Sequence, residues 1–191
     1  ILLVMLFHFG LIHKDIYSSN ILLQFMQLGW LGVDLFFVLS GFLITSILVE
    51  TKASTHYFRN FLARRFLRIW PLYYAVLILL FVVTPLVLNP LPEALQDMNN
   101  KQAWFWLYAA NWLFAREGGF EQTSGGYFWS LAVEEQFYLV WPIIVYYFSN
   151  RNLMRLCALL FAVSFISRAW LLDSGLTPSA VYVITFCRLE A

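Results

Sequence analysis

The sequence predicts an all-α protein, a polytopic bundle of helices that cross a membrane. Composition is the first reason: of 191 residues, 61% are hydrophobic and only 12% are charged, whereas a soluble domain is about half apolar and a quarter charged. The second reason is that the apolar residues form long runs, with a mean hydropathy of +0.71. These two features exclude a soluble globular enzyme, a disordered chain and a secreted disulfide scaffold.

Charge and cysteine placement exclude further classes of protein. The formal net charge is +1 and the chain has no basic tail, which argues against a nucleic-acid partner. Cys157 and Cys187 both lie inside apolar runs, so we expect neither a disulfide nor a metal site from them. Because both ends of the sequence fall inside apolar runs, we interpret 1–191 as the N-terminal part of a single membrane domain, truncated at both ends.

About six spans are expected, the first and the last of them truncated, since a spanning helix needs about 20 predominantly apolar residues. In chain order they are 1–12, 28–49, 70–88, 128–148, 153–173 and a sixth that begins near Ser179. Pro85 removes a backbone donor from the third span, which should bend or unwind there. The run 103–115 has about 13 residues, too few to span, and predicts an interfacial or re-entrant segment.

The loop 50–69 sets the expected orientation. It carries five basic residues against Glu50 alone, namely Lys52, Arg59, Arg64, Arg65 and Arg68. Positive loops stay in the cytoplasm, so we expect a multi-pass protein of the cell membrane, in contact with lipid, with this loop inside. Aromatic and aliphatic residues recur at helical spacing through 58–69, which predicts an amphipathic helix on the cytoplasmic surface that leads into the third span.

Ionisable residues within the spans are candidate functional groups, because charge in hydrocarbon is costly. Four of them should share one layer, roughly 8–10 Å in from the outer surface: His8, Asp34, Glu134 and Arg168. Arg188 should lie somewhat deeper, on the sixth span. Tyr138 shares a helical stripe with Glu134, whereas Glu135 lies about 100° away around the helix. Arg168, Arg188 and Tyr138 are therefore candidates for support of the polar layer.

Each candidate also has a plain structural interpretation. His8 could be a hydrogen-bonded packing residue. Asp34 and Glu134 could merely neutralise Arg168 and Arg188, and the arginines of 64–68 could anchor the chain on anionic lipid. The residues alone leave an enzyme and a transporter or exporter nearly level, with a structural membrane subunit as a third class.

The chain resembles the membrane acyltransferase-3 family along essentially its whole length. Four blocks occur in the family's order: LFHFG at 6–10, GWLGVDLFFVLSGFLIT at 29–45, FLARRFLRIWPLYY at 61–74 and WSLAVEEQFYLVWP at 129–142. TFCRLEA at 185–191 is similar to the start of a further block. Four blocks together make the resemblance specific, which no single block would.

The resemblance implies site residues one by one. It implies a catalytic histidine at His8, acidic catalytic residues at Asp34 and Glu134, and an acyl-CoA-binding Arg-x-x-Arg pair at Arg65 and Arg68. The family's arginine about ten residues before the histidine falls ahead of this sequence, and its later helices are missing. We therefore expect the chain alone to be inactive.

The reaction that the resemblance implies is O-acylation, with acetyl as the expected acyl group. The donor would be acyl-CoA, with no other cofactor and no metal, and the acceptor a hydroxyl of a cell-surface carbohydrate, a glycolipid or a related molecule. His8 would act as general base, with its tautomer fixed by Asp34 or Glu134. The sequence has no Gly-x-Ser-x-Gly elbow, which favours direct transfer and leaves an acyl-histidine intermediate as the open alternative.

Overall fold

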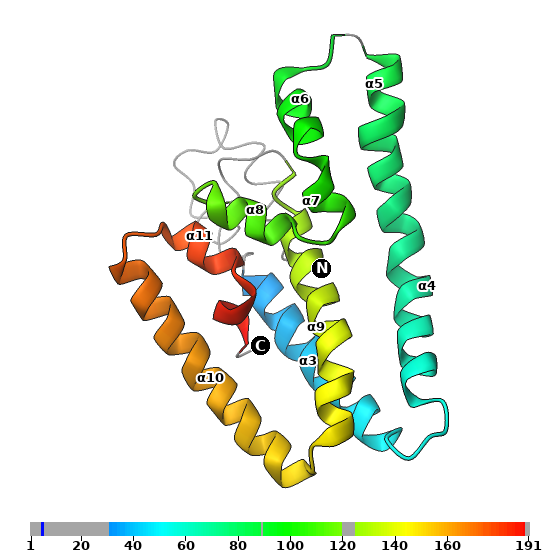
Figure 1. Ribbon diagram of the computed structural model, residues 1–191, viewed down its shortest axis with the longest axis vertical. Helices are drawn as coiled ribbons and strands as arrows, with labels where there is room; N and C mark the ends of the chain where they lie inside the picture. The colour runs from blue at the N-terminus through cyan, green and yellow to red at the C-terminus, as the bar shows by residue number, and fades with distance from the viewer. Residues whose placement is uncertain (1–4, 6–30, 89, 120–124, 190–191) are drawn as a thin grey trace. The chain divides into compact units, whose positions relative to one another are not determined.

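The computed structural model describes residues 5, 31–88, 90–119 and 125–189, and every regular element within these ranges is a helix (Figure 1). The all-α prediction is confirmed for this part of the chain. Two compact units divide the protein, Ile1–Ser46 with Ala191 and Ile47–Glu190. The first predicted span, 1–12, lies outside the described residues except for Met5.

Most of α3 (Leu31–Glu50) belongs to the first unit, and its last turn belongs to the second. Its 20 residues are long and apolar enough to cross a membrane, as the prediction for 28–49 requires. Thr45 lies inside this apolar helix, and its Oγ1 donates to the Gly41 carbonyl at 2.6 Å. The hydroxyl thereby has a hydrogen-bond acceptor within its own helix.

The second unit is dominated by one long helical rod, α4 (Tyr57–Ile78), the π-helical turn η2 (Leu79–Val83) and α5 (Thr84–Val87). Together they give 31 residues that could span a membrane. The helix predicted over 58–69 is present and leads into the third span without a break at 69–70, while its position on the cytoplasmic surface stays a prediction. Pro71 lies inside α4, where the loss of a single backbone donor does not end the helix.

Pro85 disturbs the rod in the expected place but in an unexpected form. Proline has no backbone N–H, and the turn before it widens so that the Thr84 N–H bonds to the Leu79 carbonyl, five residues back. The Thr84 Oγ1 donates to the same carbonyl at 2.7 Å. The chain therefore stays helical at Pro85 instead of unwinding, with a π-turn as the irregularity.

The segment 103–115, which is predicted not to span, contains two short helices instead of one long helix, while its interfacial or re-entrant placement stays a prediction. α6 (Glu93–Asn100) is followed by α7 (Gln102–Trp106) and α8 (Ala110–Arg116), and the break contains Tyr108 with a left-handed φ of 50°. Lys101 contacts Asp97 at 2.8 Å and Glu117 at 2.5 Å, and its hydrogen bond to Asp97 raises the pKa of Lys101. These ion pairs connect the end of α6 to the residue after α8.

Two further helices match predicted spans closely. α9 (Phe128–Tyr147) and α10 (Asn150–Asp173) agree with 128–148 and 153–173. In the part of the chain that the structure describes, three helical stretches are long and apolar enough to cross a membrane: α3, the rod from Tyr57 to Val87, and α10. The structure thus supports three of the six predicted spans by length and composition.

The predicted sixth span is wrong over the residues that the structure describes. α11 (Pro178–Val183) ends after six residues, Ile184 is extended, and the 3₁₀ turn η3 (Thr185–Arg188) follows. The Asn111 amide donates to the Val183 carbonyl at 3.3 Å and to the Thr185 Oγ1 at 2.9 Å. These side-chain bonds satisfy the carbonyl where the helix ends. Arg188 therefore lies in a short turn and not deep within a spanning helix.

Candidate functional site

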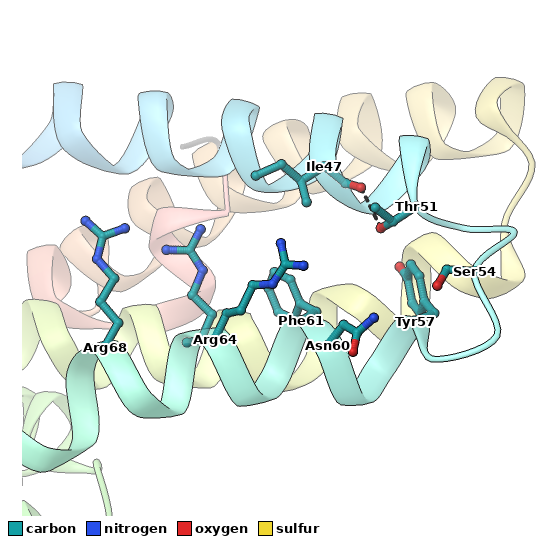
Figure 2. A pocket seen from close by; sticks show the side chains of 9 residues that line it. Ile47, Thr51, Ser54, Tyr57, Asn60, Phe61, Arg64 and Arg68 are labelled. Atoms are coloured by element: carbon teal, nitrogen blue, oxygen red, sulfur yellow. Dashed lines mark hydrogen bonds between the residues drawn. The ribbon is translucent and has the colours of Figure 1, made fainter.

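A pocket of about 210 Å³ opens in the second unit, where the end of α3, the loop 51–56 and α4 meet (Figure 2). Its lining consists of Ile47, Thr51, Ser54, Tyr57, Asn60, Phe61, Arg64, Arg65 and Arg68. Three of these side chains are cationic and none is a carboxylate. The pocket is therefore suited to an anion.

The floor of the pocket is rigid and aromatic. Tyr57 is 4% exposed and donates from its hydroxyl to the Pro142 carbonyl of α9 at 3.0 Å. Phe61, one turn further along α4, is also buried. Both rings are held by packing against their surroundings. The polar side chains of the pocket therefore lie next to a well-packed aromatic surface.

The two arginines of the predicted donor pair face different surroundings. The Arg65 guanidinium lies over the Tyr138 ring at 5.1 Å and over the Phe61 ring at 5.8 Å, so it is directed towards α9. Arg68 is exposed, and Figure 2 shows it on the same side of α4 as Arg64. Within the described ranges, no Asp or Glu forms an ion pair with Arg64, Arg65 or Arg68. Their guanidinium groups are therefore available to an anionic ligand.

Glu134 lies next to this cationic surface. It is 8% exposed and accepts a hydrogen bond from the Tyr138 hydroxyl at 2.9 Å, so the shared stripe of Glu134 and Tyr138 is confirmed. Arg65 and Arg68 are the cations that interact electrostatically with the Glu134 carboxylate. The structure thus brings together four residues that the sequence singled out, two from α4 and two from α9.

Glu135 has a different partner, as its position around the helix predicts. It is 5% exposed, and its Oε2 accepts a hydrogen bond from the Trp70 Nε1 of α4 at 3.0 Å. Sequence reasoning gave no role to this pair, nor to Asn60 and Arg64 in the pocket. The sequence does contain a pattern that could have identified Asn60 and Arg64: residues 60, 64 and 68 recur at the four-residue spacing of one helix face.

The remaining candidates lie elsewhere. His8 is outside the described residues, and Asp34 belongs to the first unit, in the first turn of α3. The Arg168 Nε donates to the Cys187 carbonyl at 2.7 Å, and the Arg188 guanidinium lies 3.6 Å from the Tyr182 ring centroid. Arg168 of α10 thus contacts η3, and Arg188, the last residue of η3, contacts α11. The polar layer shared by His8, Asp34, Glu134 and Arg168 stays a prediction. The bond from Trp70 to Glu135 does not support an outer position for Glu134, because Trp70 begins the third span on its predicted cytoplasmic side.

Comparison with known sequences identifies the family. A family described as "Acyltransferase domain" matches residues 1–189. The chain belongs to this acyltransferase family. The resemblance carried by the four blocks is thereby confirmed, and the Arg65, Arg68, Glu134 and Tyr138 cluster belongs to an acyltransferase domain.

Several curated relatives share this domain. The chain is 35% identical over 173 residues to "Peptidoglycan O-acetyltransferase OatA" of Listeria monocytogenes, covering 84% of this chain and 27% of the relative. It is 36% identical over 170 residues to "O-acetyltransferase OatA" of Staphylococcus aureus, with 83% and 27% covered. "Putative peptidoglycan O-acetyltransferase YrhL" of Bacillus subtilis is 34% identical over 173 residues, with 84% and 27% covered. The chain therefore spans about a quarter of the length of these relatives. No solved structure matches.

Proposed function

We propose that the full-length protein is a multi-pass O-acetyltransferase of the cell membrane. It would move an acetyl group from acetyl-CoA to a hydroxyl of peptidoglycan or another cell-surface carbohydrate. Family membership supports the class of reaction. The names of the relatives support acetyl as the group and peptidoglycan as the acceptor.

The observation that carries the donor assignment is the pocket beside α4. Coenzyme A is polyanionic, and guanidinium groups bind phosphate through two parallel hydrogen bonds. Arg65 and Arg68 line the pocket, and both act electrostatically on the Glu134 carboxylate. A donor held by these arginines would therefore have its phosphates close to a candidate catalytic carboxylate, with the pantetheine arm free to extend along α9.

The proposed chemistry is direct transfer. His8 would take the proton from the acceptor hydroxyl as that oxygen attacks the thioester carbon. The C–S bond would then break, and the proton on the imidazole would pass to the leaving thiolate, which leaves as coenzyme A. Glu134 or Asp34 would stabilise the imidazolium, and the Tyr138 hydroxyl bond would hold the Glu134 carboxylate in one orientation. The bonds and protons of the proposed transfer balance without a metal or a further cofactor.

The test is acetyl transfer from radiolabelled acetyl-CoA by the purified full-length protein and by its Arg65→Lys and Arg68→Lys variants. Lysine keeps the charge but loses the bidentate fork, so each variant should lose about tenfold or more in kcat/KM for acetyl-CoA. Arg59→Lys is the matched control, because Arg59 is exposed on the same helix and does not line the pocket. Full transfer by both lysine variants would remove the arginines from the donor site and leave lipid anchoring as their role.

A further inference from the structure

The proposed binding of the donor by Arg65 and Arg68 gives no role to two other polar side chains of the pocket, Asn60 and Arg64. Both line the pocket with Arg68, and the three recur every four residues along α4, about 6 Å apart along the helix axis. Figure 2 shows Asn60, Arg64 and Arg68 along α4, the helix that also carries the buried Tyr57 and Phe61. Among the described residues, neither Asn60 nor Arg64 has a side-chain hydrogen bond or ion pair.

The two ends of this stripe, which consists of residues 60, 64 and 68, have different neighbours. Just beyond Arg68, Trp70 bonds to Glu135 of α9 at 3.0 Å, whereas Tyr57, near Asn60, bonds to the Pro142 carbonyl at 3.0 Å, so the Arg68 end of the stripe lies nearer Glu134. The other end of the stripe, at Asn60, lies beside Tyr57 and the loop that contains Ser54. The stripe therefore runs from the part of α4 nearest the candidate catalytic carboxylate to the loop 51–56, which contributes Ser54 to the pocket lining.

The phosphates of coenzyme A also occupy fixed positions relative to its reactive thioester. Its ribose carries a diphosphate at the 5′ position, which continues into the pantetheine arm and the thioester, and a separate phosphate at the 3′ position. Because the thioester must reach the reacting groups, the diphosphate belongs at the end of the stripe near Arg65 and Arg68. The 3′-phosphate then lies on the far side of the ribose, away from Glu134.

We propose that Arg64, assisted by the Asn60 amide, binds the 3′-phosphate of the donor and makes the protein selective for coenzyme A over its 3′-dephospho form. This inference rests on the proposed donor. The Arg64 guanidinium supplies two parallel donors to a phosphate, and the Asn60 amide supplies a third. Arg64 is thus a specificity-determining residue, separate from the Arg65 and Arg68 pair.

An anionic lipid headgroup offers the same phosphate chemistry near a cytoplasmic surface. The position of Arg64 and Asn60 inside a pocket favours the soluble donor over a lipid headgroup. The buried Tyr57 and Phe61 rings line the same pocket, as do the hydroxyls of Thr51 and Ser54. The two sources can be separated by changing the lipid while the nucleotide is kept constant.

The experiment measures the Kd of coenzyme A and of 3′-dephospho-coenzyme A for the full-length protein by calorimetry, in vesicles of phosphatidylcholine. The wild type should bind coenzyme A about 10-fold to 100-fold more tightly, the range expected for a charge-assisted hydrogen bond. Arg64→Gln should reduce this preference to about one, with the Kd of the dephospho form unchanged, which also shows that the variant is folded. Arg59→Gln, which removes an exposed arginine outside the pocket, should keep the preference.

Four outcomes would overturn the inference. Equal binding of the two nucleotides by the wild type, or an unchanged preference in Arg64→Gln, would show that no phosphate is read at Arg64, while the proposed donor would stand. A preference that depends on Arg64 only when phosphatidylglycerol is added would assign the residue to lipid. If the wild type binds neither nucleotide, the proposed donor itself fails.

Discussion

The helices α9 and α10 follow each other in the chain and are of similar length, yet they have opposite surroundings. Ten of the 20 residues of α9 are buried, Glu134 and Glu135 among them. Only Leu153, Ser164 and Leu171 are buried among the 24 residues of α10, whose large apolar side chains point outward. Protein therefore surrounds much of α9, whereas α10 presents a surface suited to lipid.

The difference shows where a long apolar helix can carry charge. Each carboxylate of α9 has a protein partner, Tyr138 for Glu134 and Trp70 for Glu135, which offsets part of the cost of taking the charge out of water. The middle of α10 contains no Asp, Glu, Lys or Arg between Arg155 and Arg168. Burial against other helices provides the partners with which α9 carries its two carboxylates.

The largest expected effect concerns Glu134. In the full-length protein, Glu134→Gln should lower acetyl transfer about 10²-fold or more, because the amide keeps the shape and the bond to Tyr138 but cannot stabilise a cationic base. Single-turnover transfer from acetyl-CoA is the measurement. Glu135→Gln is the control, since its amide oxygen can still accept from Trp70. Equal losses in the two variants would mean that α9 uses its carboxylates only for packing.

The next largest effect is expected on α10. Phe165 is 70% exposed, and Phe165→Lys should cost about 2.5–3.5 kcal/mol of insertion free energy if this face meets hydrocarbon. The fraction of protein that resists alkaline carbonate extraction should fall accordingly. An unchanged fraction would show that this face of α10 meets water or protein, and the contrast with α9 would disappear.

A smaller loss is expected for the amide network that holds α9 in the second unit. Asn111 is fully buried and bonds to Val183, Thr185 and Gln136. Asn111→Leu leaves those groups without their partner, so the free energy of unfolding should fall by about 1–3 kcal/mol. Thermal unfolding in detergent measures it. Asn152→Leu at the exposed start of α10 is the control, and an equal shift there would contradict the role of the network.

The smallest effect is expected for a conservative change on the exposed face of α10. Ile166 is 65% exposed on α10, and Ile166→Leu keeps an apolar side chain of the same volume. The free energy of unfolding should change by less than about 0.5 kcal/mol, as measured by the same thermal unfolding. A larger loss would indicate that Ile166 packs against a protein surface.

Sequence periodicity and length predicted α3, α9 and α10 to within a few residues, because each helix is an apolar run with clear ends. They could not predict which helix would be buried, since α9 and α10 are both apolar and burial depends on long-range contacts. The sixth span failed for a related reason. The bonds from Asn111 that end α11 at Val183 come from a residue 72 positions away, and no local pattern reports them.

The candidate site was predicted in part. Arg65, Arg68, Glu134 and Tyr138 were identified through the resemblance and are brought together in the structure. Asn60 and Arg64 were missed because a basic, exposed stripe has the same pattern whether it faces lipid, solvent or a pocket. Only the fold of the loop 51–56 and the end of α3 over this stripe distinguishes the three surroundings.

The length of the rod from Tyr57 to Val87 has a consequence for where the donor would bind. Its 31 residues extend about 46 Å, which exceeds a hydrocarbon core of about 30 Å by roughly half. The apolar part from residue 69 to Val87 is by itself about 28 Å long, a near match to that thickness. If that apolar part crosses the bilayer, the three turns that carry Asn60, Arg64 and Arg68 project beyond the hydrocarbon, together with the part of α9 between Glu135 and Pro142 that bonds to Trp70 and Tyr57 of the same helix. A soluble nucleotide would therefore meet its phosphate ligands at headgroup level, and only its uncharged arm would have to enter the bilayer.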